Sequence, residues 1–178
     1  ASTNGKKIQV LLEPHVTAEE SKQGFCPEDI YDILKSADKT RVWDTASGWF
    51  KGAESDVESE HVYFKKVKLP STDKPIVLSE FGGYSMKVSG HVFCEDKEFG
   101  YRKFRSESEL VAALKVLYLE KLKPLIAEGL CACVYTQVSD VEEEINGLVT
   151  YDRQVIKVPV GEMKAISDEI TKEANKIV

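Results

Sequence analysis

Short apolar runs alternate along this chain with stretches that have the spacing of an amphipathic helix, and this alternation constrains the fold more than any other feature. The runs occupy residues 8–12 (IQVLL), 40–45 (TRVWDT), 61–64 (HVYF), 76–81 (IVLSEF) and 130–140 (LCACVYTQVSD). Continuous apolar runs of this length are typical of parallel strands that helices cover on both faces. We therefore expect an α/β fold.

Three stretches have the spacing of helices. The first follows Pro27, with apolar side chains at positions 30, 33, 34 and 37. The second begins at Ser106, an N-cap whose capping-box partner is Glu109, and its apolar stripe continues to Gly129. The third follows Pro159 and closes the chain. The order of these elements predicts one domain over residues 1–178, with about five mostly parallel strands.

The charge balance and the cysteines argue against several classes of function. The net charge is −6 and the pI is near 5.2, with basic residues interleaved among acids, which does not suit a nucleic-acid partner. No apolar run is long enough to cross a membrane, and the first residues contain no signal-peptide core. The four cysteines lack the spacing of a disulfide scaffold or a metal site. We expect reduced thiols, a cytoplasmic location, no membrane partner, no metal and no cofactor.

Polar residues stand at the ends of three expected strands, where functional groups gather in parallel α/β folds. They are Asp44, His61 and Glu80. Glu80 is the sharpest candidate, because an acid that ends an apolar run and precedes Phe and two glycines is poorly suited to packing. The glycines permit a tight turn and leave space beside the carboxylate. The alternative is a carboxylate that caps the loop or pairs with an arginine.

Aromatic and amide side chains offer further candidates near these strand ends. Trp49, in the segment that follows Asp44, could stack on the face of a sugar or could pack in the core beside a turn. Tyr135 and Gln137 share one face of the last strand by alternation. That strand end is therefore expected to be polar on one side.

Three segments, in matching order along the chain, resemble glycoside hydrolase family 2, the family of β-galactosidases, β-glucuronidases and β-mannosidases. Residues 75–85 (PIVLSEFGGYS) closely resemble the nucleophile strand of that family. Residues 38–50 (DKTRVWDTASGWF) are similar to the segment after its acid/base strand. Residues 133–153 (CVYTQVSDVEEEINGLVTYDR) look like its last barrel strand and the loop that closes the domain. The resemblance spans roughly residues 25 to 160.

This resemblance implies a retaining β-glycosidase in which Glu80 is the nucleophile and forms a covalent glycosyl-enzyme intermediate. A second carboxylic acid would protonate the leaving oxygen and then activate water, with the two carboxyl groups about 5–5.5 Å apart. The residues implied to contact the carbohydrate substrate, or to support those that do, are Asp44, Trp49, His61, Tyr84 and Gln137.

The chain departs from the family pattern at the acid/base. In the family this residue follows an asparagine as Asn-Glu, and the sequence contains no such pair. The corresponding place holds Glu19-Glu20, and Glu20 is the favoured acid/base. Glu13, which ends the first apolar run, is its rival by position.

The chain is also short for a complete barrel. A (β/α)8 barrel needs about 250 residues, whereas this chain has 178. The resemblance therefore implies a partial (β/α) barrel with helices outside, equivalent to the C-terminal half. Exposed sheet edges and an open barrel face predict self-association or pairing with the missing N-terminal half. The alternatives to an enzyme are an inactive carbohydrate-binding or structural half-barrel and an unrelated small α/β domain.

Overall fold

The protein has a mixed α/β fold built around a three-stranded parallel sheet. The computed structural model describes residues 30–45, 48–49, 54–63 and 65–177. The sheet has the order β1-β2-β5, from β1 (Glu58–Val62), β2 (Ile76–Gly82) and β5 (Leu130–Thr136). Both strand pairs are parallel, as the apolar runs predicted. The central strand is β2, which accounts for its continuous apolar start.

Two further strands lie beyond the carboxyl end of β2. β3 (Tyr84–Met86) and β4 (Arg102–Phe104) pair in parallel as a second, two-stranded sheet. The five strands of the described residues thus divide between two sheets, and the three-stranded sheet is open.

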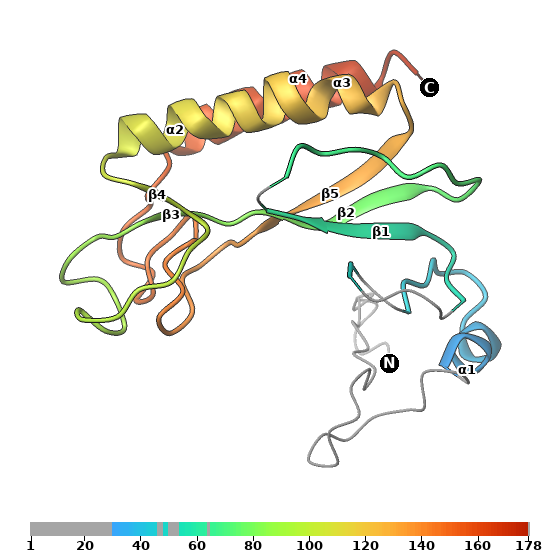
Figure 1. The fold of residues 1–178 in the computed structure, drawn as a ribbon, viewed down its shortest axis with the longest axis horizontal. Coiled ribbons are helices and arrows are strands. Elements are labelled where there is room, and N and C mark those ends of the chain that lie inside the picture. The colour runs from blue at the N-terminus through green and yellow to red at the C-terminus, as the bar shows by residue number, and fades with distance from the viewer. Residues whose placement is uncertain (1–29, 46–47, 50–53, 64, 178) are drawn as a thin grey trace, which may run out of the picture.

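Helices cover one side of the main sheet (Figure 1). α2 (Glu107–Lys115), the π-helical segment η1 (Val116–Leu122) and α3 (Lys123–Ile126) follow one another without a break, and α4 (Val160–Ala174) packs along them. α1 (Ile30–Ala37) lies on the other side of the sheet. Within the described ranges, none of these helices combines the length and the apolar character that a membrane span requires.

The hydrophobic core lies between the sheet and the covering helices. Leu78 and Phe81 of β2 are each 1% exposed and belong to this core. The helix side chains buried to 2% or less are Leu110, Leu114, Leu122 and Ile166. This packing fixes which side of β2 faces the helices.

An irregularity in β2 determines which side of the sheet carries Glu80. Leu78 pairs with Cys133 and Phe81 with Tyr135, so β2 takes three steps where β5 takes two, and the pairing with β1 also shifts at this point. In a regular strand, side chains three residues apart point to opposite faces, yet Leu78 and Phe81 both lie in the core. This β-bulge therefore turns Glu80 away from the helices.

The strand expected over residues 40–45 is wrong, because this segment forms no strand in the structure. The Trp43 N–H donates to the Asp56 carboxylate at 2.8 Å, so a side chain replaces the neighbouring strand as its partner. Val42 is 70% exposed, which a buried strand would not allow. The strand expected at 61–64 begins earlier, as β1. The run at 8–12 lies outside the described residues.

The expected helices are confirmed, and their ends follow the local signals. α1 falls in the amphipathic stretch and α4 begins directly after Pro159. Ser106 caps α2, with its hydroxyl accepting from the Glu109 N–H at 3.3 Å. The Glu109 carboxylate accepts a hydrogen bond from the Arg105 N–H at 2.9 Å. In a standard capping box this donor would be the N–H of Ser106, one residue later.

Candidate active site

Glu80 is held on the sheet face opposite the helices by His61 of β1 and by Tyr63, which directly follows that strand. The Tyr63 hydroxyl donates to Glu80 Oε2 at 2.5 Å, and His61 Nδ1 lies 3.3 Å from the same oxygen. His61 is the register partner of Glu80, so the parallel pairing brings together two residues singled out in the sequence. The Glu80 side chain remains 45% exposed and is open to a ligand.

Tyr63 links all three strands of the sheet. Its hydroxyl oxygen lies 3.2 Å from Thr136 Oγ1 in β5 as well as against Glu80 in β2. Burial, reinforced by the hydrogen bond to Glu80, raises the pKa of the Tyr63 phenol, so the phenol stays protonated and acts as a donor. Because the phenol has one proton, giving it to Glu80 leaves the Thr136 hydroxyl to donate in turn.

These contacts leave one carboxylate oxygen for chemistry. Within the described residues, Tyr63 and His61 both approach Glu80 Oε2, and no contact of this kind falls on Oε1. A charge-assisted hydrogen bond of this length fixes the orientation of a carboxylate. The arrangement therefore presents Oε1 as the oxygen that can attack an electrophilic carbon.

Gly82 and Gly83 shape the turn after Glu80. Their φ angles are 89° and 61°, values that glycine adopts without strain. The space beside them is filled, since a Cβ at Gly82 would overlap the Tyr135 ring and one at Gly83 the Tyr101 ring. Tyr101 in turn stacks on Tyr63, with ring centroids 3.9 Å apart. The glycines therefore admit two aromatic rings, of which Tyr101 supports Tyr63, while the Glu80 carboxylate itself stays 45% exposed.

Trp49 lies on the other flank of His61. The two rings meet edge to face with centroids 5.9 Å apart, and the Trp49 indole N–H donates to the His61 carbonyl at 3.3 Å. Gly48, with φ of 72°, allows this approach because a Cβ there would overlap the imidazole. Trp49 is 66% exposed, so it is not the core residue of the alternative interpretation, and its ring is accessible to a ligand.

A cavity of about 420 Å³ adjoins this group of residues. Its lining includes Trp49, His61 and Tyr63, together with lysines of the segment after β1. A volume of this order suits a small-molecule ligand. The cavity thus places an exposed aromatic ring and the partners of Glu80 around one space.

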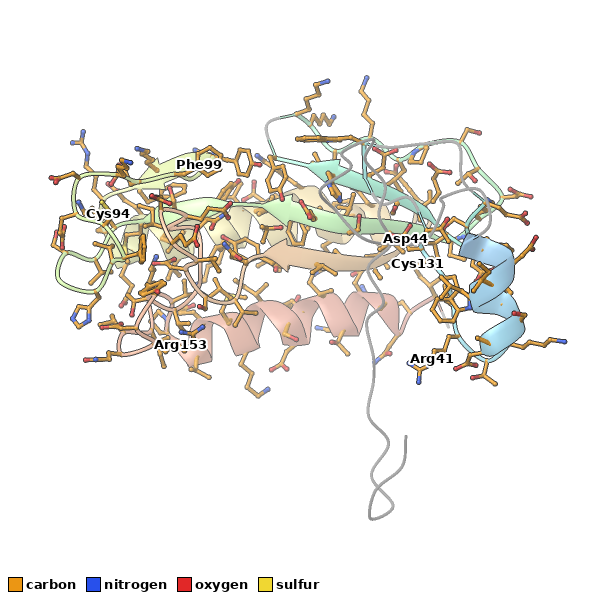
Figure 2. The ribbon with its side chains drawn as sticks, turned by 90° about the horizontal axis from the view of Figure 1, so that it is seen from below. Arg41, Asp44, Cys94, Phe99, Cys131 and Arg153 are labelled. Atoms are coloured by element: carbon orange, nitrogen blue, oxygen red, sulfur yellow. The ribbon has the colours of Figure 1, made fainter. Side chains whose placement is uncertain are left out.

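Asp44 does not join the Glu80 group. Its Oδ1 accepts a hydrogen bond from the Ser59 hydroxyl at 3.0 Å, and Ser59 stands near the start of β1. Figure 2 shows Asp44 and Cys131 near the beginnings of the strands, whereas Phe99 and Arg153 lie toward the opposite end of the molecule. Asp44 therefore connects the segment that follows α1 to the start of β1.

Tyr84 and Gln137 form no hydrogen bond with the Glu80 carboxylate within the described residues. Tyr84 is 5% exposed, and its ring packs against Phe104 at 5.3 Å in the core. Gln137 follows Thr136 and donates to Asn146 Oδ1 and Glu144 Oε2, each at 2.9 Å. Its amide therefore organises the loop after β5.

The two candidates for the second carboxylate, Glu20 and Glu13, lie outside the described residues. The groups around Glu80 that the sequence analysis missed are Tyr63, Tyr101 and Thr136. Tyr63 could have been found by alternation, because it stands two residues after His61 in the run at 61–64 and so shares its face.

In comparisons with known proteins, no family model matches the chain and no curated protein matches it. The part of the chain that the structure describes contains no group of three or more His, Cys, Asp or Glu side chains able to hold a metal ion.

Proposed function

We propose that this chain forms part of a retaining β-glycosidase of the family 2 type, with Glu80 as the nucleophile. The observation that carries the proposal is the Glu80 carboxylate itself. Tyr63 and His61 fix one of its oxygens, the other is open, and the exposed Trp49 ring stands nearby. An oriented carboxylate beside an accessible aromatic surface suits attack on a sugar bound by stacking.

In this mechanism, Glu80 Oε1 attacks the anomeric carbon and displaces the leaving-group oxygen. A second carboxylic acid, Glu20 or its rival Glu13, protonates that oxygen as the glycosidic bond breaks. The same residue then takes a proton from water, which attacks the anomeric carbon and releases Glu80. The Tyr63 hydroxyl withdraws charge from the carboxylate in both steps, which makes Glu80 a better leaving group in the second.

We also propose that the open sheet is a segment of a (β/α)8 barrel. Three features support this architecture: the parallel order β1-β2-β5, the helices on one side, and the polar contacts of Glu80 on the other. In such a barrel the helices lie outside. The remaining strands would come from another part of a longer protein or from association between copies.

A second candidate is a carbohydrate-binding or structural module without hydrolytic activity. The absence of an Asn-Glu pair from the sequence favours it, because the resemblance assigns the acid/base to that pair. Such a module would retain the exposed Trp49 surface and the cavity beside it.

Covalent labelling separates these two candidates. The chain is incubated with a panel of 2-deoxy-2-fluoro-β-glycosyl fluorides, and its intact mass and peptides are measured. A retaining enzyme gains one fluoroglycosyl group on the peptide containing Glu80. Glu80→Gln should gain none, whereas Glu120→Gln, an exposed carboxylate change on the helix side, should label as the unaltered chain does. Sugar binding without labelling would identify the module, and labelling that survives Glu80→Gln would refute the assignment of the nucleophile.

A further inference from the structure

Three lysines line the same cavity as Trp49. Lys65, Lys66 and Lys68 follow β1 directly, and all three contribute to the same 420 Å³ space as Trp49 and His61. All three are exposed. The cavity therefore has an aromatic wall and a cationic wall.

Among the residues that the structure describes, no carboxylate forms an ion pair with the three lysines. Lysines elsewhere on the surface do form ion pairs, as Lys115 does with Glu162 at 2.6 Å. Among the described residues that line the cavity, one carries a carboxylate, Glu60. The lining thus has three ammonium groups against one carboxylate, in a chain whose net charge is −6. A concave surface with one dominant sign of charge concentrates ligands of the opposite sign.

The cavity also touches the partners of Glu80. His61 and Tyr63 line it and at the same time contact the Glu80 carboxylate. A sugar that occupies the cavity can therefore contact Trp49, the partners of Glu80 and the lysines. The lysines suit a carboxylate or sulfate carried by the sugar, because lysine ammonium groups bind such anions as point charges.

We propose that Lys65, Lys66 and Lys68 form a subsite for an anionic carbohydrate, whose uronate or sulfate group binds at this wall while its ring stacks on Trp49. The inference rests on the proposed function for the direction of the sugar toward Glu80. It concerns binding, however, and is tested without turnover.

The test is isothermal titration calorimetry, in which matched monosaccharides are titrated into the full chain. The ligands are methyl β-D-glucoside, methyl β-D-glucuronide and methyl β-D-glucoside 6-sulfate, with the corresponding galactose series and inorganic sulfate alongside. We expect a uronide or sugar sulfate to bind about tenfold more tightly than its neutral counterpart at 20 mM salt. This preference should weaken at 200 mM salt, since the lysines are exposed and screened. The two anionic arms show whether a carboxylate or a sulfate is preferred.

Two triple variants isolate the lysines from the overall charge. In the first, the residues changed to Gln are Lys65, Lys66 and Lys68; in the matched control they are Lys164, Lys172 and Lys176, in and just after α4. The first should lose the preference for the anionic sugar and the control should keep it. Equal binding of neutral and anionic sugars by the unaltered chain would overturn the proposal, as would a preference that survives the first triple change. Inorganic sulfate that binds as tightly as the sugar sulfate would overturn the carbohydrate assignment. Failure of Glu80 to label, with anionic binding intact, would count against the glycosidase and not against the subsite.

Discussion

Replacement of Lys157 by Met tests a fully buried ion pair. Lys157 Nζ lies 2.7 Å from Asp140 Oδ1, and both side chains are fully buried. The ammonium also donates to the Ile145 carbonyl at 3.0 Å, and Asp140 Oδ1 accepts from the Gly147 N–H at 2.8 Å. Asp140 Oδ2 has no hydrogen-bond partner within the described residues. Lys157→Met keeps most of the side-chain volume and removes the charge.

The expected loss of stability follows from the unpaired Asp140 carboxylate that the substitution leaves in the interior. Loss of one member of a buried ion pair leaves an uncompensated charge and destabilises by about 3–5 kcal/mol. For a chain of this length, each kcal/mol lowers Tm by about 2–4 °C, so Tm should fall by about 6–20 °C. The exposed pair of Lys164 and Asp168, with side chains 71% and 62% exposed, supplies the control: Lys164→Met should change stability by less than about 1 kcal/mol.

The pH dependence gives this prediction a sign. Burial raises the pKa of Asp140 and lowers that of Lys157, because desolvation disfavours both charged forms, while their mutual contact opposes each shift. In Lys157→Met the burial of Asp140 is opposed only by the hydrogen bond from the Gly147 N–H, so the folded-state pKa of Asp140 lies further above the unfolded value. The native state then binds more protons than the unfolded state, and the stability of the variant falls as pH rises through that window.

Urea unfolding followed by circular dichroism, at pH 5 and pH 8, measures both effects. We expect the stability gap between Lys157→Met and the unaltered chain to be smaller at pH 5 than at pH 8, because protonation of Asp140 in the folded variant becomes more favourable as pH falls. A gap below about 1 kcal/mol at pH 8, or one that does not narrow at pH 5, would refute the account of a buried, charge-dependent contact.

Two further substitutions probe the surroundings of the carboxylate. Tyr63→Phe removes the hydrogen-bond donor to Glu80, and a hydrogen bond to a charged group contributes about 1.5–3 kcal/mol. We therefore expect kcat/KM, or the rate of fluorosugar labelling, to fall by about 10- to 150-fold, while circular dichroism shows that the fold persists. An unchanged rate would show that the phenol is not needed. Gly82→Ala forces a Cβ into the Tyr135 ring. The matched control is Gly90→Ala, because Gly90 has a similar φ of 84° and open space around it. We expect Gly82→Ala to lower the free energy of unfolding by about 1–3 kcal/mol more than the control does; equal losses for the two variants would mean that the ring moves aside freely.

The sequence predicted the helices and the central strand because their signals are local. The N-cap at Ser106, the proline before α4 and the apolar run of β2 each act within a few residues. The segment at 40–45 shows the limit of such signals. Its apolar letters suit a strand, but its backbone is satisfied by Asp56, thirteen residues beyond Trp43, and nothing local indicates that contact.

The site was predicted in part for the same reason. Glu80 and His61 each stand out at the end of an apolar run, and the parallel register then brings them together. The bulge in β2 was not predictable, because regular alternation from the buried Leu78 would have pointed Glu80 into the core. It arises from pairing with both neighbouring strands and from the burial of Phe81. The buried pair of Asp140 and Lys157 likewise depends on a long-range contact.

The face of the sheet that carries Glu80 has an exposed apolar side chain in β5. Val134 follows Cys133, which packs against the core, so its side chain points to the Glu80 face, where it is 57% exposed. A valine beside a 45% exposed carboxylate is a surface that a covering segment would dehydrate. Exclusion of water strengthens the electrostatic interactions on which glycosyl transfer depends. Under the proposed function, a segment that covers this face would therefore do more than extend the sheet: it would place Glu80, Tyr63 and His61 in low-dielectric surroundings, where their electrostatic interactions are stronger.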